Sequence, residues 1–249
     1  MSERVLVLGA TSGIGRALVR ALAADGAELV VAGRDRAQLE RIAADAALRS
    51  GRPVAAEPYD ALCPESHAAF LDACFAHADG LDGVVLCHGT MVEQKVAERE
   101  LAPALEMLDV NVRGSISLLE GAARRLEAAG SGWIAALSSV AAERGRRRNY
   151  LYGASKAALS VTLEGMRSRL AHAGIPVVDV RPGPVDTRLT WARGLPAVAS
   201  PERVARDLLR GVRRGRAVVY SPWPWRLVML GVRWLPASLV ERFDARATR

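Results

Sequence analysis

Short apolar runs alternate with longer segments of helical period along most of this 249-residue chain. The runs are continuously apolar, and seven of them cover residues 4–9, 27–33, 53–60, 82–89, 132–139, 175–183 and 217–220. Strands of this kind are buried on both faces, which parallel sheets achieve by lying between layers of helices. The alternation therefore predicts one α/β domain with a doubly wound parallel sheet of about seven strands and helices on both faces.

Composition narrows the class of protein. Half of the residues are hydrophobic, so a chain of this length can bury a sizeable core. No run of 18 apolar residues occurs and the N-terminus leads directly into a strand-like segment, so we expect a cytoplasmic protein without a signal peptide. Three cysteines without C-x-x-C spacing and four scattered histidines argue against a disulfide framework and against a metal site.

The net charge of +7 lies at one end of the chain. Residues 201–249 hold 11 Arg against 4 Asp plus Glu, which accounts for the whole excess and leaves residues 1–200 neutral. Nucleic-acid binding would need these arginines to form a groove-sized stripe with aromatic platforms. Since the charge is confined to the C-terminal segment, we expect no nucleic-acid partner.

Two predicted helices begin with capping signals. Asp35 followed by Gln38 forms a capping-box pattern before a helical segment. Ser200 followed by Pro201 is the pattern of an N-cap and first helical residue, which predicts a helix to about Arg213.

A glycine-rich turn follows the first predicted strand. In LGATSGIGRALVRAL, Gly9, Gly13 and Gly15 lie where the strand gives way to a helix. Glycines let the backbone turn tightly and approach a pyrophosphate, whose charge the helix N-terminus then stabilises. Such a turn can also merely connect strand and helix, but its position in the first βαβ unit favours a dinucleotide site in a Rossmann sheet.

The residues after the second predicted strand bear on the choice of dinucleotide. An acidic residue there binds the adenosine ribose of NAD, whereas an arginine accommodates the 2′-phosphate of NADP. The strand ends in AGRDR, so Arg34 favours NADP(H) over NAD(H). Asp35 lies 20 residues past Gly15 and is the alternative, NAD-selecting residue, but its capping-box context gives it a structural role.

A tyrosine and a lysine share one face of a predicted helix. In YLYGASKAAL, Tyr152 and Lys156 are four residues apart, and the chain contains only one other lysine, Lys95. A phenol with its ordinary pKa of about 10 is a poor acid or base at neutral pH, and a nearby ammonium favours the phenolate. The alternative is a surface lysine on an ordinary helix, which the rarity of lysine in this chain disfavours.

Taken together, these motifs resemble the short-chain dehydrogenase/reductase family of single-domain type over about residues 4–220. The matching segments are GATSGIG at 9–15, Asp60 after the third strand, Asn111 in DVNVRG, Ser139 in ALSSV, YGASK at 152–156 and RPGPVDT at 181–187. The resemblance implies a dinucleotide-binding and catalytic Rossmann domain at 1–220, extended by a Trp- and Arg-rich helical segment at 221–249. It also implies a homodimer or homotetramer.

The resemblance implies a set of catalytic residues for reducing a ketone to a secondary alcohol. Tyr152 would donate a proton to the developing alkoxide, and Ser139 would hydrogen-bond the same oxygen. Lys156 would hold the nicotinamide ribose and lower the Tyr152 pKa, and Asn111 would help to order a proton-relay water. Ser139 precedes Tyr152 by 13 residues, as the family requires, but a register shift of one residue would give its role to Ser138.

The cofactor site implied by the resemblance follows the carboxyl ends of the strands. Asp60 would contact the adenine, and Val185 and Thr187 would hold the nicotinamide carboxamide. The full set of implied cofactor-binding residues is Gly9, Thr11, Ser12, Gly13, Ile14, Gly15, Arg34, Asp60, Gly89, Tyr152, Lys156, Pro182, Gly183, Val185 and Thr187.

One segment departs from the family pattern. Where the family commonly has N-N-A-G after the fourth strand, this chain has LCHG at 86–89, which keeps Gly89 and lacks the supporting asparagine. His88 is then either a second acid/base group or, as we expect, a residue that packs beside the cofactor.

The C-terminal tail, SPWPWRLVMLGVRWLP, holds Trp223, Trp225 and Trp234. Tryptophan and arginine flanking short apolar runs are typical of segments at a membrane interface, and this run is too short to span a bilayer. The tail therefore predicts either a peripheral contact of 221–249 with the inner face of the membrane, or short helices that cover the substrate cleft or a subunit interface.

An arginine run precedes the YGASK motif, formed by Arg144, Arg146, Arg147 and Arg148. It could meet a phosphate of a lipid-linked substrate, or form a solvated cluster in a chain with 32 arginines. The stretch SSVAAERGRRRNYLYGASKAAL, taken with the tail, is similar to the decaprenylphosphoryl-2-keto-pentose reductases, which implies a lipid-linked keto-sugar and NADH. Arg34 conflicts with that cofactor, so another hydrophobic ketone, or a non-enzymatic NADP-binding sensor or scaffold, stays open.

Overall fold

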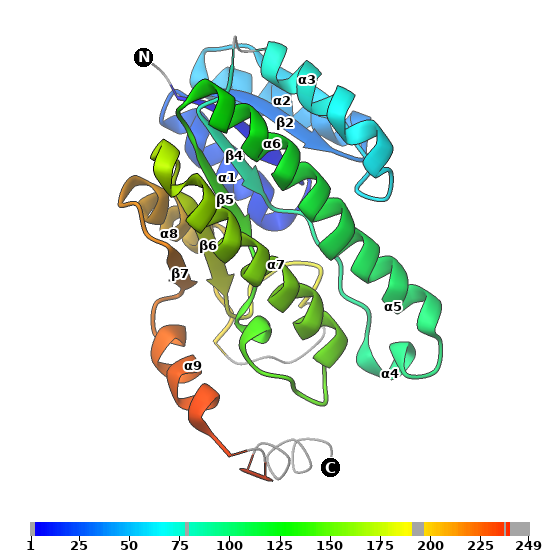
Figure 1. Ribbon diagram of the computed structural model, residues 1–249. Helices are drawn as coiled ribbons and strands as arrows, with labels where there is room; N and C mark the ends of the chain where they lie inside the picture. The colour runs from blue at the N-terminus through cyan, green and yellow to red at the C-terminus, as the bar shows by residue number, and fades with distance from the viewer. Residues whose placement is uncertain (1–2, 78–79, 191–196, 237, 240–249) are drawn as a thin grey trace.

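The computed structural model describes residues 3–77, 80–190, 197–236 and 238–239. Within them, seven parallel strands form one sheet in the order β3-β2-β1-β4-β5-β6-β7 (Figure 1). The strands are β1 (Arg4–Leu8), β2 (Glu28–Gly33), β3 (Val54–Pro58), β4 (Gly83–Leu86), β5 (Trp133–Leu137), β6 (Val177–Pro182) and β7 (Val218–Ser221). Each strand lies in or overlaps one of the seven apolar runs, so the predicted doubly wound sheet is confirmed.

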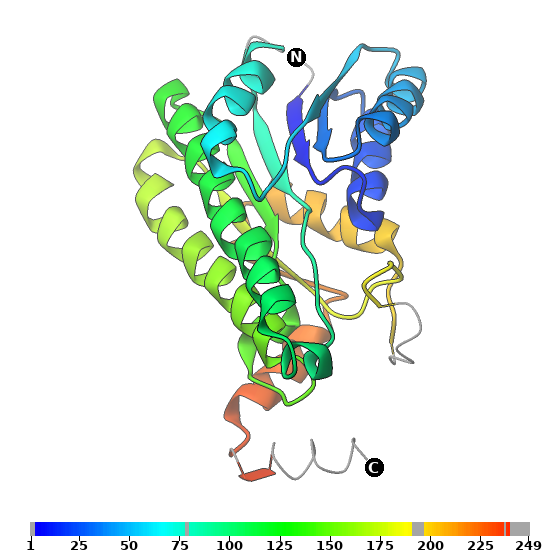
Figure 2. The ribbon, with the colours of Figure 1, turned by 90° about the vertical axis from the view of Figure 1, so that its right-hand side faces the viewer.

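Helices cover both faces of the sheet (Figure 2). The first layer consists of α1 (Gly13–Ala24), α2 (Arg36–Ser50) and α8 (Pro201–Arg213). The second consists of α3 (His67–Ala76), α6 (Ser115–Ala129) and α7 (Tyr150–Leu170).

Each strand supplies side chains to both layers, because successive residues of a strand point to opposite faces. In β1, Val5 and Val7 pack in the core beneath the first layer, whereas Leu6 and Leu8 pack beneath the second. All four side chains are fully buried. This is why the strand sequences read as uninterrupted apolar runs.

The winding of the chain reverses at β1. This strand pairs with β2 on one side and with β4 on the other, so the loops that follow β1 and β4 leave the sheet in opposite directions. In open α/β sheets a ligand crevice forms outside the carboxyl ends of the strands at such a reversal. The expected site residues therefore gather at this edge.

Both predicted helix caps are present. The Asp35 carboxylate accepts hydrogen bonds from the Gln38 backbone nitrogen at 3.0 Å and from Gln38 Nε2 at 2.6 Å. Ser200 Oγ accepts from the Arg203 backbone nitrogen at 3.2 Å, and α8 ends at Arg213 as expected. Since both oxygens of Asp35 are used on α2, the structure supports its capping role.

The chain from 83 to 150 adds α4 (Gln94–Ala97), α5 (Leu101–Leu108), a π-helical turn η2 (Asp109–Gly114) and a 3₁₀ turn η3 (Val140–Glu143). After β7 a short helix, α9 (Trp225–Trp234), projects from the sheet (Figure 1). None of the helices in the described ranges is both long and apolar enough to cross a membrane. Residues 240–249, which belong to the predicted extension, lie outside the described residues.

Candidate active site

The glycine-rich turn after β1 has room for backbone only. Gly9 has a φ of +80°, and a Cβ on it would lie 2.5 Å from the His88 backbone nitrogen. A Cβ on Gly15 would lie 2.3 Å from the Gly9 carbonyl oxygen. Ser12 Oγ accepts from the Gly15 backbone nitrogen at 3.0 Å and thereby caps α1. The turn, which also contains Thr11 and Ile14, thus leads directly into the N-terminus of α1. The free backbone N–H groups and the dipole of a helix N-terminus favour the binding of an anion.

An open cavity of about 490 Å³ lies at the ends of β2 and β3. Its lining residues are Arg34, Pro58, Tyr59, Asp60, Cys63, Glu65 and Ser66. Arg34 is exposed, and Asp60 Oδ1 accepts from the Leu62 backbone nitrogen at 3.0 Å. Arg34 and Asp60, 26 positions apart in the sequence, therefore share one cavity. The residue before Arg34 approaches the glycine-rich turn, because a Cβ on Gly33 would lie 3.5 Å from Thr11 Oγ1.

Lys156 is buried at the carboxyl end of β5 and lies on α7, the same helix as Tyr152. Its Nζ donates to the Leu137 carbonyl oxygen at 2.9 Å and lies 6.0 Å from the centroid of the Tyr152 ring. Burial lowers the pKa of Lys156 to about 8, and the nearby Asp179 carboxylate opposes this effect. A Cβ on Gly89 would lie 3.1 Å from Nζ, so this glycine leaves space for the ammonium.

The two serines after β5 point to different partners. The Ser138 hydroxyl donates to the Asp179 carboxylate inside the sheet, and only 2% of the residue is exposed. Ser139 Oγ accepts from the Ala141 backbone nitrogen at 3.1 Å, which leaves its own O–H able to donate. Ser138 is thus committed to the core, and Ser139 is the residue with donor capacity at the crevice.

The turn that follows Ser139 is packed against the start of α7. A Cβ on Gly153 would lie 2.8 Å from the Ala141 carbonyl oxygen, so the helix approaches η3 closely at the residue after Tyr152. Asn111 adds a second tie to this helix. Its Nδ2 donates to the Thr90 carbonyl oxygen at 2.8 Å and to Ser155 Oγ at 3.1 Å.

Asn111 is fully buried in η2, between α5 and α6. Its Oδ1 accepts from the Thr90 backbone nitrogen at 2.8 Å, and both Nδ2 protons have acceptors on Thr90 and Ser155. The amide therefore fastens the segment after β4 to α7, and only acceptor capacity is left for a further ligand.

His88 is a half-buried link between three segments. Tyr59 and Ser115 contact its two ring nitrogens, with Tyr59 Oη 2.7 Å from Nδ1 and Ser115 Oγ 3.0 Å from Nε2. Ser115 Oγ donates to the Val110 carbonyl oxygen, so His88 donates from Nε2 and accepts from the Tyr59 hydroxyl at Nδ1. Burial lowers the His88 pKa to about 3, which keeps the ring neutral. Both nitrogens are engaged, which favours packing over acid/base chemistry.

The loop after β6 lies between the glycine-rich turn and the tail. Thr187 is close to the turn, because a Cβ on Gly13 would lie 2.9 Å from its Cγ2. Val185 is buried and pairs with Ala199 in an isolated bridge. At the other end of the loop, after Pro182, a Cβ on Gly183 would lie 2.1 Å from Trp225 Nε1. The implied carboxamide-binding residues are thus next to the implied pyrophosphate turn.

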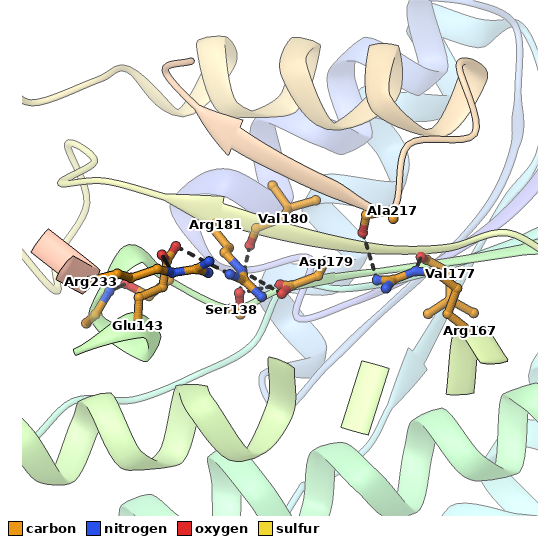
Figure 3. A network of polar contacts seen from close by, with 11 residues as sticks. Ser138, Glu143, Arg167, Val177, Asp179, Val180, Arg181, Ala217 and Arg233 are labelled. Carbon is orange, nitrogen blue, oxygen red and sulfur yellow. Dashed lines mark hydrogen bonds and ion pairs between the residues drawn. The ribbon is translucent and has the colours of Figure 1, made fainter. Parts of the chain in front are cut away.

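A chain of ion pairs, buried at Asp179 and Glu143, connects β6 to α9 (Figure 3). Arg181 Nε lies 2.7 Å from an Asp179 oxygen, and Arg181 Nη1 lies 3.4 Å from Glu143 Oε1. The other Glu143 oxygen lies 2.6 Å from Arg233 Nε, although the Glu143 side chain is only 2% exposed. The segment VVDVRP places a charged pair, Asp179 and Arg181, inside an otherwise apolar strand, and this is the local signal from which the network could have been predicted.

Two members of the arginine run contact α9. Arg144 Nη2 donates to the Leu235 carbonyl oxygen at 3.1 Å, just past the end of the helix, and Arg146 Nη2 lies 3.7 Å from Met229 Sδ. A cation at the last carbonyls of a helix stabilises its C-terminus. These two arginines thus hold the tail against the turn that follows Ser139.

Comparison with known proteins agrees with this geometry. The family model for short chain dehydrogenases matches residues 3–195. An uncharacterized oxidoreductase of Streptomyces coelicolor, from the 5′ region of mprA, is 39% identical over 249 residues, covering 96% of this chain and 94% of that protein. An uncharacterized oxidoreductase of Mycobacterium tuberculosis (strain ATCC 25618 / H37Rv) is 35% identical over 241 residues, covering 96% of each.

A solved structure shows the same likeness. The 3-oxoacyl-[acyl-carrier protein] reductase from Brucella melitensis, determined in complex with NAD, is 25% identical, with a TM-score of 0.79 over 89% of this chain and 96% of that one. A doubly wound sheet with a glycine-rich turn at its crevice is typical of dinucleotide-binding proteins. The chain belongs to the short-chain dehydrogenase/reductase family and is an NAD(P)-dependent enzyme of that family.

Proposed function

We propose that this enzyme reduces a ketone to a secondary alcohol, with NADP(H) preferred over NAD(H), and that its substrate is hydrophobic or lipid-linked. The observation that carries the proposal is the buried Lys156 ammonium, 6.0 Å from the Tyr152 ring centroid. Residues 1–220 carry the cofactor and catalytic groups, and residues 221–249 extend the same domain.

The crevice fits a dinucleotide, because Gly9 and Gly15 form a cradle that any Cβ would fill. NADP(H), when bound, supplies the hydride. The α1 N-terminus holds the pyrophosphate, the cavity with Arg34 and Asp60 takes the adenosine end, and Val185 and Thr187 bind the carboxamide.

The chain's own groups move the proton. Tyr152 donates it to the oxygen of the carbonyl being reduced, and the Ser139 hydroxyl donates a hydrogen bond to that oxygen. Lys156, charged at pH 7, stabilises the phenolate that Tyr152 becomes on giving up this proton, and it holds the nicotinamide ribose; solvent water returns the proton to Tyr152. Asn111 positions α7 through Ser155 and can help to order a relay water only as an acceptor.

The serine assignment predicts two different losses. Ser139→Ala should lower kcat by about 10²- to 10³-fold, because one donor to the developing oxyanion is removed. Ser138→Ala should instead lower the free energy of unfolding by about 1–3 kcal/mol, because it takes a donor from the buried Asp179 carboxylate. Steady-state kinetics and urea unfolding of both variants measure this. A larger loss of kcat in Ser138→Ala than in Ser139→Ala would reverse the assignment.

Arg34 should select the 2′-phosphate. Because a charge-assisted hydrogen bond contributes about 1.5–3 kcal/mol, Arg34→Gln should raise the KM for NADPH by about 10- to 100-fold and leave that for NADH nearly unchanged. Arg36→Gln is the matched control, since Arg36 is exposed but is absent from the cavity lining. Equal effects of Arg34→Gln on both cofactors would remove the basis for NADP(H) preference.

The substrate class is tested by a screen of NADPH and NADH oxidation. Long-chain ketones and polyprenyl-phosphate keto-sugars are compared with small soluble ketones, with and without detergent or liposomes. We expect turnover of the hydrophobic compounds with NADPH. Turnover of the keto-sugars with NADH would favour the decaprenylphosphoryl-2-keto-pentose type, whereas activity on small ketones alone would refute a hydrophobic substrate.

We also propose a homodimer or homotetramer formed through the helices near Asn111 and Tyr152. Three apolar side chains on α5 and α7 are exposed, namely Leu101 at 61%, Leu105 at 49% and Val161 at 68%. Light scattering measures the mass in solution, and a monomer at micromolar concentration would contradict this assembly.

A further inference from the structure

The outer face of α9 carries a stripe of apolar side chains. It is formed by Trp223, Leu227, Leu230 and Trp234, which are 61%, 59%, 55% and 82% exposed. Their spacing of four, three and four residues places them along one side of the helix and of the turn before it. In the described part of the chain, a helix face with two exposed tryptophans at its ends occurs only here.

The opposite face of α9 is fixed to the rest of the protein. Met229 is fully buried, and the Trp225 indole lies against Gly183. The Arg233 side chain reaches the buried Glu143 carboxylate, as Figure 3 shows. Arg144 holds the end of the helix through the Leu235 carbonyl. The apolar stripe is therefore presented by an ordered helix whose inner side is already occupied.

The positive charge around the stripe indicates the kind of surface that it binds. Residues 221–240 contain no Asp or Glu, and the exposed Arg226 flanks the stripe on one side of the helix. The arginine run that contacts α9 adds further positive charge at the same edge. A short helix with an apolar face, flanking arginines and terminal tryptophans suits the interfacial zone of a bilayer with anionic headgroups.

We propose that the outer face of α9 docks on an anionic lipid surface. The tryptophans and leucines enter the headgroup boundary, and Arg226 faces the lipid phosphates. The carboxyl edge of the sheet, where β7 leads into α9, is thereby held next to the membrane. This inference does not depend on the proposed reaction, because neither cofactor nor substrate takes part in the docking.

Sedimentation with vesicles tests the docking on the full-length protein. The variant Leu227→Glu/Leu230→Glu should bind vesicles of phosphatidylglycerol and phosphatidylcholine at least about tenfold more weakly than the wild type. The matched control is Leu48→Glu, because Leu48 is 87% exposed on α2, away from α9, and should bind like the wild type. Vesicle binding should weaken in about 0.5 M salt, because salt screens the attraction between the arginines and the lipid phosphates.

The other outcomes overturn the proposal. They are a wild type that does not sediment with the vesicles, a double variant that binds as well as Leu48→Glu, and equal binding to pure phosphatidylcholine. Light scattering of the same proteins tests whether the stripe binds a second copy of the protein instead of lipid. A mass that falls only in the double variant would identify the stripe as a subunit contact. NADPH binding by each variant is measured separately as a control for folding. A failure of vesicle binding with NADPH binding intact would contradict the docking proposal and would not contradict the proposed reaction.

Discussion

Tyr152→Phe is expected to lower kcat for carbonyl reduction by about 10²- to 10⁴-fold, the usual contribution of a positioned general acid. The substitution removes one hydroxyl and keeps the ring, which is half-exposed and lies over Lys156. The Kd for NADPH should therefore change little. Stopped-flow hydride transfer and fluorescence titration of NADPH measure the two quantities separately.

The control for this variant is Tyr150→Phe. Tyr150 lies two residues earlier on α7 and is 43% exposed, so loss of its hydroxyl should leave kcat within about twofold of the wild type. A Tyr152→Phe enzyme that keeps full activity would refute the proton-transfer assignment. A loss of NADPH binding as large as the loss of kcat would instead make Tyr152 a cofactor-binding residue.

Lys156→Met should have the second largest effect, in two independent measurements. Without the ammonium the phenolate is no longer favoured and the nicotinamide ribose loses a donor. We therefore expect kcat/KM at pH 7 to fall by about 10²- to 10⁴-fold. Methionine fills a similar volume without a charge, so the helix should stay folded.

The second measurement is the pH dependence of stability. Because burial lowers the Lys156 pKa from 10.5 to about 8, the folded protein loses this proton before the unfolded chain does. Between these two pH values the unfolded chain holds more protons, so this lysine makes the free energy of unfolding rise with pH, by about 3 kcal/mol in total. Well below pH 8 the buried lysine is charged in both states, and it then lowers the free energy of unfolding by this full amount.

Urea unfolding of wild type and Lys156→Met without cofactor, from pH 7 to pH 10.5, isolates this contribution. Groups that do not interact with Lys156 titrate alike in both proteins and cancel in the difference. The Cys87 thiol is the exception, because the Lys156 charge lowers its pKa, so the comparison is best made in a Cys87→Ala background. The stability of the wild type relative to Lys156→Met should increase with pH. A difference that stays constant would show that Lys156 is not held in the low-dielectric position seen here.

The strand runs, the glycine turn and the two helix caps could be predicted from sequence because each depends on neighbours. Backbone sterics fix Gly9, and Asp35 caps a helix through a residue only three positions away. The family assignment and the doubly wound sheet, both expected from such patterns, are confirmed. The spacing of Tyr152 and Lys156 likewise follows from helical periodicity.

The arginine run shows where this reasoning ends. Sequence suggested a phosphate site or a solvated cluster, but Arg144 and Arg146 contact a helix more than 80 positions away. Sequence favoured Ser139 over Ser138 by its spacing from Tyr152, and the physical difference between the two is set by Asp179 in the neighbouring strand. His88 was open between two roles until Tyr59 and Ser115 were seen at its nitrogens.

The sequence by itself therefore determined the sheet, the helix starts and the spacing of the tyrosine and the lysine, because these follow from periodicity and from contacts within a few residues. Only the tertiary structure decided which partners Arg144 and Arg146 contact and which face of α9 is left to solvent. Those properties depend on burial and on charge pairs between distant segments, such as Glu143 with Arg233, whose partners no local pattern specifies.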